Sequence, residues 1–542
     1  EKFVLEGHLM VENDKTAYEK SQQIEKGEQK TTTYKPALPE SISENAALID
    51  RLLAEVTVCD PAVGSGAFPV GMMYEVVQAR TVLNAFIRDE DRTPYEFKRH
   101  FIEQSLYAVD IDAGATEISR LRLWLSLVVD EDNFHQIKPL PNLDYKIMRG
   151  DSLLSIEMNL FNREKFAELE KIKPIYLNET NPNKKHRLKQ QIDHLIAEIT
   201  SGHKEFDFKV YFSEVFHNTA GFDIVIGNPP YIQLQKDGGR LAKLYEKQNY
   251  QTFARTGDIY CLFYEKGIQL LRDGGHLCFI TSNKWMRAGY GEKLREYFTK
   301  YNPVILIDLG PGVFENATVD TNILLIQKKQ TPEKHLKAVT LQKQNDTVNI
   351  EQQLQERAVI LEKLTKDAWF IGSSVEQRLK EKIEHIGKPL KDWDVNIYYG
   401  IKTGLNEAFI ITTEKRNEIL ANCKDEDERK RTEAIIKPIL RGRDIKRYYY
   451  EWAGLWVIVI PAGWTNENRG KENAEKFIEK NFPSLMNHLR PFEAKAKNRD
   501  DQGDYWWELR HCAYYPEFEK EKVVYSEIVR QPQFYFDTEN FY

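Results

Sequence analysis

The sequence has few cysteines, and their spacing fits neither a disulfide framework nor a zinc site. The five thiols lie at positions 59, 261, 278, 423 and 512, with no CxxC pair among them. Disulfide scaffolds and zinc sites both depend on paired or closely spaced cysteines. We therefore expect no disulfide-stabilised fold and no metal site.

Long apolar runs are also missing. A membrane-spanning helix needs about 18 consecutive apolar residues, and every apolar run here is far shorter. No basic leader followed by an apolar core opens the chain. These absences predict a cytoplasmic protein with no membrane partner. Its 542 residues leave room for about three domains of roughly 150 residues each.

The chain has no excess of positive charge. Its net charge is −7, whereas a nucleic-acid-binding surface needs Lys and Arg to neutralise phosphates. A local basic groove can coexist with acidic outer faces. The total charge therefore does not exclude DNA as a partner.

A third glycine is absent from the clearest ligand-binding loop. A β-rich run ends at Asp60-Pro-Ala-Val-Gly-Ser-Gly-Ala-Phe68 and leads into an apolar, helix-like segment. Gly64 and Gly66 allow a ligand to approach the backbone, and a helix N-terminus supplies free N–H groups. A dinucleotide-binding loop would have glycine in place of Pro69 and an acidic residue about 20 residues later. The pattern predicts a nucleotide cradle of another kind.

Two later strands end in carboxylates. The segment 105–112 ends in Asp110, with Asp112 as the nearby alternative, and either is suited to a ribose diol. The segment 145–153 ends in Asp151, which can accept a hydrogen bond from an adenine amine. Because open α/β sheets bind ligands at the C-terminal ends of their strands, we expect these loops to form one site.

The most informative stretch is an apolar strand that runs into Asn228-Pro229-Pro230-Tyr231. Two prolines fix the backbone and end the strand. The Asn228 side-chain oxygen and the Pro229 carbonyl can accept both hydrogens of a planar NH2 group, and the Tyr231 ring can stack on a base. This arrangement would free the nitrogen lone pair to attack a methyl donor.

Together these segments resemble the gamma-class N6-adenine DNA methyltransferases, and among them the type IIG (Eco57I-like) restriction-modification polypeptides. The resemblance continues through residues 257–264, 274–285 and 314–326. It implies S-adenosylmethionine as cofactor and a flipped adenine of double-stranded DNA as target. The implied catalytic residues are Asn228, Pro229, Pro230 and Tyr231. The implied cofactor-binding residues are Asp60, Pro61, Ala62, Gly64, Ser65, Gly66, Ala67, Phe68, Asp110, Ile111, Asp151 and Ser152.

The expected fold class is α/β. Residues 51–330 should form a Rossmann-like S-adenosylmethionine-dependent methyltransferase sheet with a helical insertion at about 155–215. A helical segment at 1–50 should precede it, and a helical connector at 331–386 should follow. Residues 387–542 should form a mixed α/β target recognition domain that continues beyond this chain.

The C-terminal region combines aromatic and basic residues. It contains six of the nine tryptophans, and residues 437–447 hold five basic residues against one acidic residue. Basic side chains among aromatics can contact phosphates and base edges. The expected DNA-binding residues are Lys402, Arg441, Arg443, Lys446, Arg447 and Arg510.

The sequence thus predicts a site-specific DNA adenine N6-methyltransferase, the modification and specificity part of a type IIG enzyme. We expect no endonuclease activity in this chain, because its ExK triplets occur at a frequency expected by chance, and any nuclease domain would lie outside it. A phage-exclusion methyltransferase or DNA-binding component stays open as an alternative. A protein-glutamine methyltransferase is also open, since a glutamine amide is planar as well.

Overall fold

The computed structural model describes residues 38–87, 92–129, 143, 145–156, 160–179, 181–200, 206–314, 319–330, 335–341, 349–527, 529 and 531–542. The chain divides into two compact units, Glu1–His385 and Ile386–Tyr542. Most of the expected N-terminal helical segment, residues 1–37, lies outside the described residues. Its described end carries α2 (Glu40–Ser43) and the start of α3 (Ala46–Glu55).

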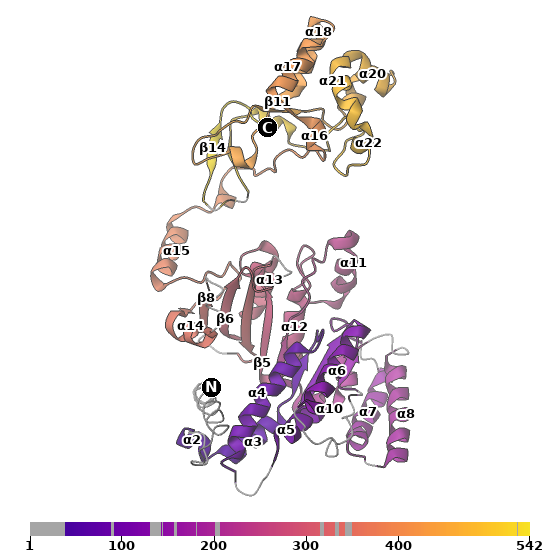
Figure 1. The fold of residues 1–542 in the computed structure, drawn as a ribbon, viewed down its shortest axis with the longest axis vertical. Coiled ribbons are helices and arrows are strands. Elements are labelled where there is room, and N and C mark those ends of the chain that lie inside the picture. The colour runs from indigo at the N-terminus through magenta and orange to yellow at the C-terminus, as the bar shows by residue number, and fades with distance from the viewer. Residues whose placement is uncertain are drawn as a thin grey trace, which may run out of the picture. The chain divides into compact units, whose positions relative to one another are not determined.

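A nine-stranded mixed sheet organises the first unit (Figure 1), in the order β3-β2-β1-β4-β5-β7-β6-β8-β9. The strands are β1 Val58–Asp60, β2 Leu106–Asp110, β3 Ile147–Arg149, β4 Phe222–Gly227, β5 Leu271–Ser282, β6 Asn302–Gly310, β7 Thr321–Gln327, β8 Leu336–Thr340 and β9 Val359–Leu361. β1 to β5 pair in parallel, whereas β7 runs antiparallel to both β5 and β6. The expected Rossmann-like α/β sheet is confirmed, and its pairing is antiparallel around β7.

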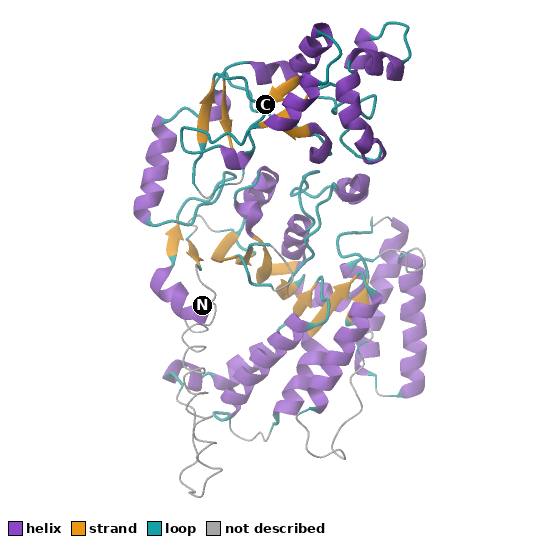
Figure 2. Cartoon of the chain, turned by 45° about the horizontal axis from the view of Figure 1, so that its top comes forward, coloured by secondary structure: helices purple, strands orange, loops and turns teal. Residues whose placement is uncertain are grey.

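Helices lie on both sides of the sheet (Figure 2). The described helices that follow α3 in this unit are α4 Ala67–Asn84, α5 Pro94–His100, α6 Ala113–Val128, α7 Leu160–Asn178, α8 Pro182–Ile199, α9 Phe208–Tyr211, α10 Ser213–Thr219, α11 Lys236–Tyr245, α12 Tyr260–Leu270, α13 Glu292–Phe298, α14 Ile350–Arg357 and α15 Ser374–Ile386. Successive strand residues point to opposite faces. Leu106 and Ala108 therefore share a core with α4, α5 and α6, while Tyr107 and Val109 share one with α10 and α12.

The helical insertion is built from α7 and α8. Asn181 caps α8, because its side-chain oxygen accepts hydrogen bonds from the Asn183 and Lys184 amides. Farther along α8, Ile192 and Ile196 are four residues apart and fully buried. This helical spacing of apolar residues is the signal from which the insertion was expected.

The described part of residues 331–386, expected as a helical connector, contains the helices α14 and α15 and also two strands. β8 pairs in parallel with β6, and β9 pairs antiparallel with β8, so both strands belong to the main sheet. The sheet therefore extends past residue 330, where the methyltransferase domain was expected to end. Short strands within a charged, Gln-rich segment carry too few residues to show an alternating pattern.

The second unit is a mixed α/β structure, as expected. Its strands are β10 Ile410–Thr412, β11 Ile436–Pro438 and β12 Leu455–Ile458, which form one sheet, and β13 Lys522–Tyr525 and β14 Phe534–Asp537, which form a hairpin. Its helices are α16 Asn406–Phe409, α17 Thr413–Ala421, α18 Glu426–Ile435, α19 Trp464–Asn468, α20 Ala474–Asn481, α21 Pro483–Leu489 and α22 Glu493–Ala496. In neither unit do the described residues include a helix long and apolar enough to cross a membrane.

Candidate active site

The glycine loop joins the C-terminal end of β1 to α4. Gly64 and Gly66 have φ angles of +51° and +80°, which side chains with a Cβ rarely adopt. A Cβ on Gly66 would lie 2.7 Å from the Ser119 Oγ and 3.1 Å from the Ser119 Cα on α6. A Cβ on Gly64 would meet open space. Gly66 therefore lets the loop pack on α6, whereas Gly64 leaves room beside the backbone.

Hydrogen bonds connect the three strand-end loops that were expected to bind a cofactor. The Gly64 amide donates to the Asp110 carboxylate at 2.8 Å. The Ser152 hydroxyl donates to the Pro61 carbonyl at 2.6 Å. The Ala62 amide donates to Asp60 Oδ1 at 2.9 Å. The structure thus brings the expected cofactor residues of β1, β2 and β3 together at one edge of the sheet.

The carboxylate oxygen Oδ2 of Asp60 is buried and has no hydrogen-bond partner among the described residues. Burial, together with the nearby Asp110 charge, raises the Asp60 pKa to about 7. A buried carboxylate oxygen without a partner costs free energy unless a ligand satisfies it. A cation such as the ammonium or sulfonium of S-adenosylmethionine would do so.

The β2 and β3 loops fit the rest of such a cofactor. The Ile111 side chain is 65% exposed beside Asp110, which leaves an apolar surface free for a base. Asp151 accepts from the Leu153 amide at 3.0 Å and from the Tyr245 hydroxyl at 2.9 Å. Each carboxylate oxygen has more than one lone pair, so Asp151 can accept a further hydrogen bond. The residues present therefore fit S-adenosylmethionine.

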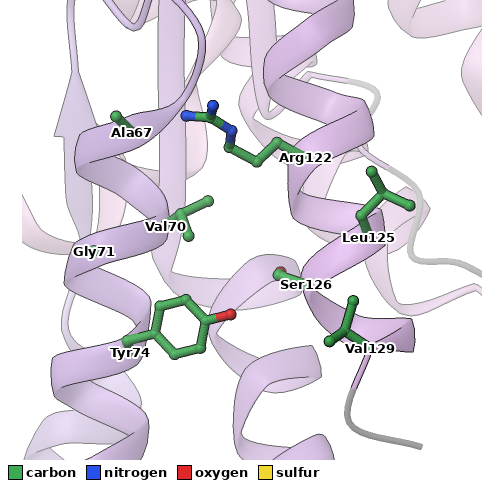
Figure 3. A pocket seen from close by; sticks show the side chains of 8 residues that line it. All are labelled: Ala67, Val70, Gly71, Tyr74, Arg122, Leu125, Ser126 and Val129. Carbon is green, nitrogen blue, oxygen red and sulfur yellow. The ribbon is translucent and has the colours of Figure 1, made fainter.

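Two residues of the glycine loop face α6. The Arg122 guanidinium donates to the Ser65 Oγ at 3.3 Å. Ala67 lines a shallow surface pocket of about 480 Å³ between α4 and α6. Figure 3 shows Arg122 reaching across this pocket toward Ala67. Any contact from Ser65 and Ala67 to a cofactor would therefore come from their backbone.

The expected catalytic segment, Asn228–Tyr231, begins where β4 ends, at Gly227. A Cβ on Gly227 would lie 2.7 Å from Asp60 Oδ1, so Asn228 starts directly beside the β1 loop. The Tyr231 hydroxyl donates to the Asn228 Oδ1 at 2.7 Å and lies 3.3 Å from the Ile280 carbonyl. Burial raises the Tyr231 pKa, as does the nearby Asp258 charge, so this phenol stays protonated. Among the described residues, no N–H or O–H donates to the Pro229 carbonyl.

Residues 257–259, which directly precede α12, hold the chain just after the Asn228–Tyr231 segment; we call them the strap. Asp258 accepts the Ile232 amide at 2.8 Å, and the Ile259 amide donates to the Ile232 carbonyl at 2.9 Å. The Tyr231 ring packs edge-on against the buried Tyr260 ring, with centroids 6.0 Å apart. Asp258 lies in a segment that carries the family resemblance, but no role was expected for it from the sequence. The sequence signal that could have identified Asp258 is a carboxylate directly before an apolar helix.

The sequence comparisons agree with this geometry. The Eco57I restriction-modification methylase family matches residues 104–314. This range contains Asp110, Asp151 and the segment 228–231. The chain carries an Eco57I-like restriction-modification methylase domain. The glycine loop precedes the matched range and is hydrogen-bonded to the methylase domain through Asp110 and Ser152.

Three curated relatives resemble the methylase domain and its surroundings. The type II methyltransferase M.BstVI of Geobacillus stearothermophilus is 25% identical over 334 residues, 58% of this chain and 54% of that protein. The type II restriction enzyme and methyltransferase RM.Eco57I of Escherichia coli is 24% identical over 370 residues, 65% of this chain and 32% of that protein. The adenine-specific methyltransferase PglX of Lacticaseibacillus casei is 22% identical over 327 residues, 54% of this chain and 25% of that protein. The chain thus spans between a quarter and about half of these relatives' lengths.

The six expected DNA-binding residues lie in the second unit, outside the methylase domain. They differ in whether their side chains are already engaged in hydrogen bonds or ion pairs. Arg441 donates to both carboxylate oxygens of Asp444, at 3.0 and 2.8 Å, and so stabilises the turn between them. Lys446 donates to the Arg443 carbonyl at 2.9 Å and lies 3.4 Å from Glu451. Counting charges along the sequence could not distinguish these engaged residues from available ones.

The other basic residues of this set are more available. Lys402, Arg443 and Arg447 are exposed, and no described side chain forms an ion pair with them. Arg510 lies 3.8 Å from Asp501, at the end of a segment whose Trp506 and Trp507 are buried in the core. The segment around Arg510 is therefore mainly structural. Lys402, Arg443 and Arg447 have exposed side chains, and their role in DNA binding stays a prediction.

Proposed function

We propose that this chain is a site-specific DNA adenine N6-methyltransferase that uses S-adenosylmethionine and acts on a base flipped out of double-stranded DNA. The observation that carries the proposal is the Asn228–Tyr231 segment, which starts beside Asp60 and so lies next to the three connected cofactor loops. The name of PglX, an adenine-specific methyltransferase, supports adenine as the base.

The cofactor supplies an electrophilic methyl group when it is bound. In the proposed arrangement Asp110 binds the ribose hydroxyls, Asp151 accepts from the adenine amine, and Ile111 covers the adenine ring. Asp60 places its unpartnered carboxylate oxygen toward the cationic end. The backbone amides around Gly64 and Gly66 line the cradle between them.

The target amine is held by two acceptors. The Asn228 Oδ1 and the Pro229 carbonyl accept its two hydrogens, which draws the nitrogen toward tetrahedral geometry and makes its lone pair available. The Tyr231 ring stacks on the base. Flipping the base costs a few kcal/mol, about the magnitude that stacking and these two hydrogen bonds can offset.

Methyl transfer is direct in this proposal, with no covalent enzyme intermediate. Cys59 and Cys261 are buried, and burial raises the pKa of both thiols. Burial also raises the Cys278 pKa to about 11. These thiols stay protonated at neutral pH and are poor nucleophiles.

The parent protein is proposed to be a type IIG restriction-modification enzyme. In that role the second unit recognises the DNA sequence, and Lys402, Arg443 and Arg447 contact the duplex. A nuclease domain, fused or separate, would lie outside this chain. The name of RM.Eco57I, a restriction enzyme and methyltransferase, supports this assignment.

The test is transfer of a labelled methyl group from S-adenosylmethionine to unmethylated duplex DNA, followed by digestion to nucleosides. We expect the label in N6-methyladenine and none with Asn228→Ala, which should bind the cofactor normally. Cofactor binding without DNA labelling would contradict the proposal. Labelling of a glutamine-containing protein instead would favour the protein-glutamine alternative.

A further inference from the structure

Three exposed basic side chains follow the proposed catalytic segment. Arg240 and Lys243 are three residues apart on one face of α11, and Lys247 lies in the short 3-10 helix Glu246–Gln248 that directly continues it. Ala242 and Tyr245 lie on the opposite face and are buried. The stripe of Arg240, Lys243 and Lys247 is therefore exposed on α11 and on the turn that continues it, and α11 is anchored by its buried side.

The stripe is not neutralised by neighbouring acids. Among the residues that the structure describes, none accepts a hydrogen bond or forms an ion pair with these three side chains. Of the two neighbouring acids in the chain, Glu246 forms an ion pair with Arg255 at 3.2 Å, and Asp237 is exposed at the start of α11. Three cations without an ion-pair partner among the described residues form a local positive surface on a chain whose net charge is −7.

The buried side of α11 is tied to the proposed active site. The Tyr245 hydroxyl donates to Asp151 at 2.9 Å, and the Ala242 amide donates to the Leu234 carbonyl at 3.1 Å. Leu234 follows Tyr231 closely and its amide donates to the Gly257 carbonyl, in the strap that holds the catalytic segment. Figure 1 shows α11 at the outer edge of the first unit. The stripe thus has a fixed place beside the segment that would hold the flipped base.

We propose that the stripe of Arg240, Lys243 and Lys247 contacts the phosphate backbone of the DNA duplex next to the flipped nucleotide. The inference rests on the proposed DNA methylation and adds a DNA-contacting surface within the first unit. A nucleotide held at Asn228–Tyr231 brings its flanking phosphates to the neighbouring surface, and unpaired Lys and Arg side chains release counterions when they bind phosphates. Such contacts position the duplex without reading its sequence.

The test compares two triple variants of the full chain. The first carries Arg240→Gln, Lys243→Gln and Lys247→Gln. The matched control carries Lys171→Gln, Lys184→Gln and Arg187→Gln, which removes three exposed basic residues from the α7–α8 hairpin. Binding of unmethylated duplex DNA is measured against salt concentration, and S-adenosylmethionine binding is measured for both variants. Glutamine keeps the helix propensity and removes only charge.

The α11 variant should lower the slope of log affinity against log salt by up to about 2.7, which is about 0.9 for each lost phosphate contact. The control should keep the wild-type slope, and both variants should bind the cofactor as the wild type does. An unchanged slope in the α11 variant, or an equal change in both variants, would overturn the inference. DNA binding that fails in the wild type as well would instead contradict the proposed function.

Discussion

The hydroxyl of Tyr231 lies 2.7 Å from the Oδ1 of Asn228, so one member of the proposed catalytic segment holds the side chain of another. The same oxygen is the proposed acceptor for the target amine. It has two lone pairs, and the Tyr231 proton occupies only one of them. The hydrogen bond therefore fixes the direction of Asn228 and leaves an acceptor position open.

Removing this hydroxyl should weaken catalysis moderately. Tyr231→Phe keeps the ring and loses one hydrogen bond worth about 1 kcal/mol, so kcat should fall about fivefold. Tyr231→Ala also loses the stacking surface, worth about 1–3 kcal/mol per base, and should lower transfer further. Single-turnover methyl transfer measures both effects.

Tyr297→Phe is the matched control, because its hydroxyl bonds to Tyr301 away from the catalytic segment. It should leave transfer unchanged. A Tyr231→Phe variant as inactive as Tyr231→Ala would show that the hydroxyl, not the ring, dominates. Wild-type activity in both Tyr231 variants would remove Tyr231 from the site.

The glycine loop offers a prediction about stability. Gly66→Ala forces a left-handed residue and a Cβ 2.7 Å from the Ser119 Oγ, so it should lower the free energy of unfolding by about 2 kcal/mol or more. Gly71→Ala in α4 meets no atom within 4 Å and should be neutral or stabilising by up to about 1 kcal/mol. Thermal or denaturant unfolding compares the two. Equal stability in both variants would contradict the close packing of the loop on α6.

The features that could be predicted from the sequence are those whose residues are close together along the chain. The glycine loop and the segment 228–231 each place their chemistry within a few residues, so their position at strand ends followed from local patterns. The helical insertion followed from apolar spacing. These features depend on short-range chemistry that a sequence displays directly.

The remaining features depend on packing between distant residues. Tyr245 reaches Asp151 across 94 positions of sequence, and no motif marks it. Arg441 looked available for DNA, but the fold places Asp444 against its guanidinium. The strands β8 and β9 are too short to display an alternating pattern. Such pairings arise from the tertiary structure, which overrides local composition.

The buried carboxylate of Asp60 predicts a pH dependence of cofactor binding. Its folded pKa is raised to about 7 from an ordinary value of 3.8, so the folded protein favours the neutral acid. Its contribution to stability is therefore present at low pH and is lost as the pH rises from about 4 to about 7. A cationic cofactor prefers the ionised form, so its affinity should rise about tenfold between pH 6 and pH 8.

Calorimetric titration with S-adenosylmethionine across this range measures the effect. Asp60→Asn cannot ionise and should bind weakly with little pH dependence. A wild-type affinity that falls as the pH rises would show that Asp60 does not face the cation.

The hydrogen bond between Asp258 and the Ile232 amide predicts that a substitution of Asp258 lowers catalysis without changing cofactor binding. Asp258→Ala removes the acceptor for the Ile232 amide, which directly follows Tyr231, so the catalytic segment should lose its fixed position. The loss of one such hydrogen bond is worth about 1–2 kcal/mol, which predicts a fall in kcat of about tenfold. Asp258→Asn keeps an acceptor oxygen and should restore most of the activity. Cofactor affinity should stay within about twofold of the wild type in both variants, because no described residue of the three cofactor loops is hydrogen-bonded to Asp258. If Asp258→Ala weakened cofactor binding and catalysis equally, the strap would support the whole sheet edge rather than position Tyr231.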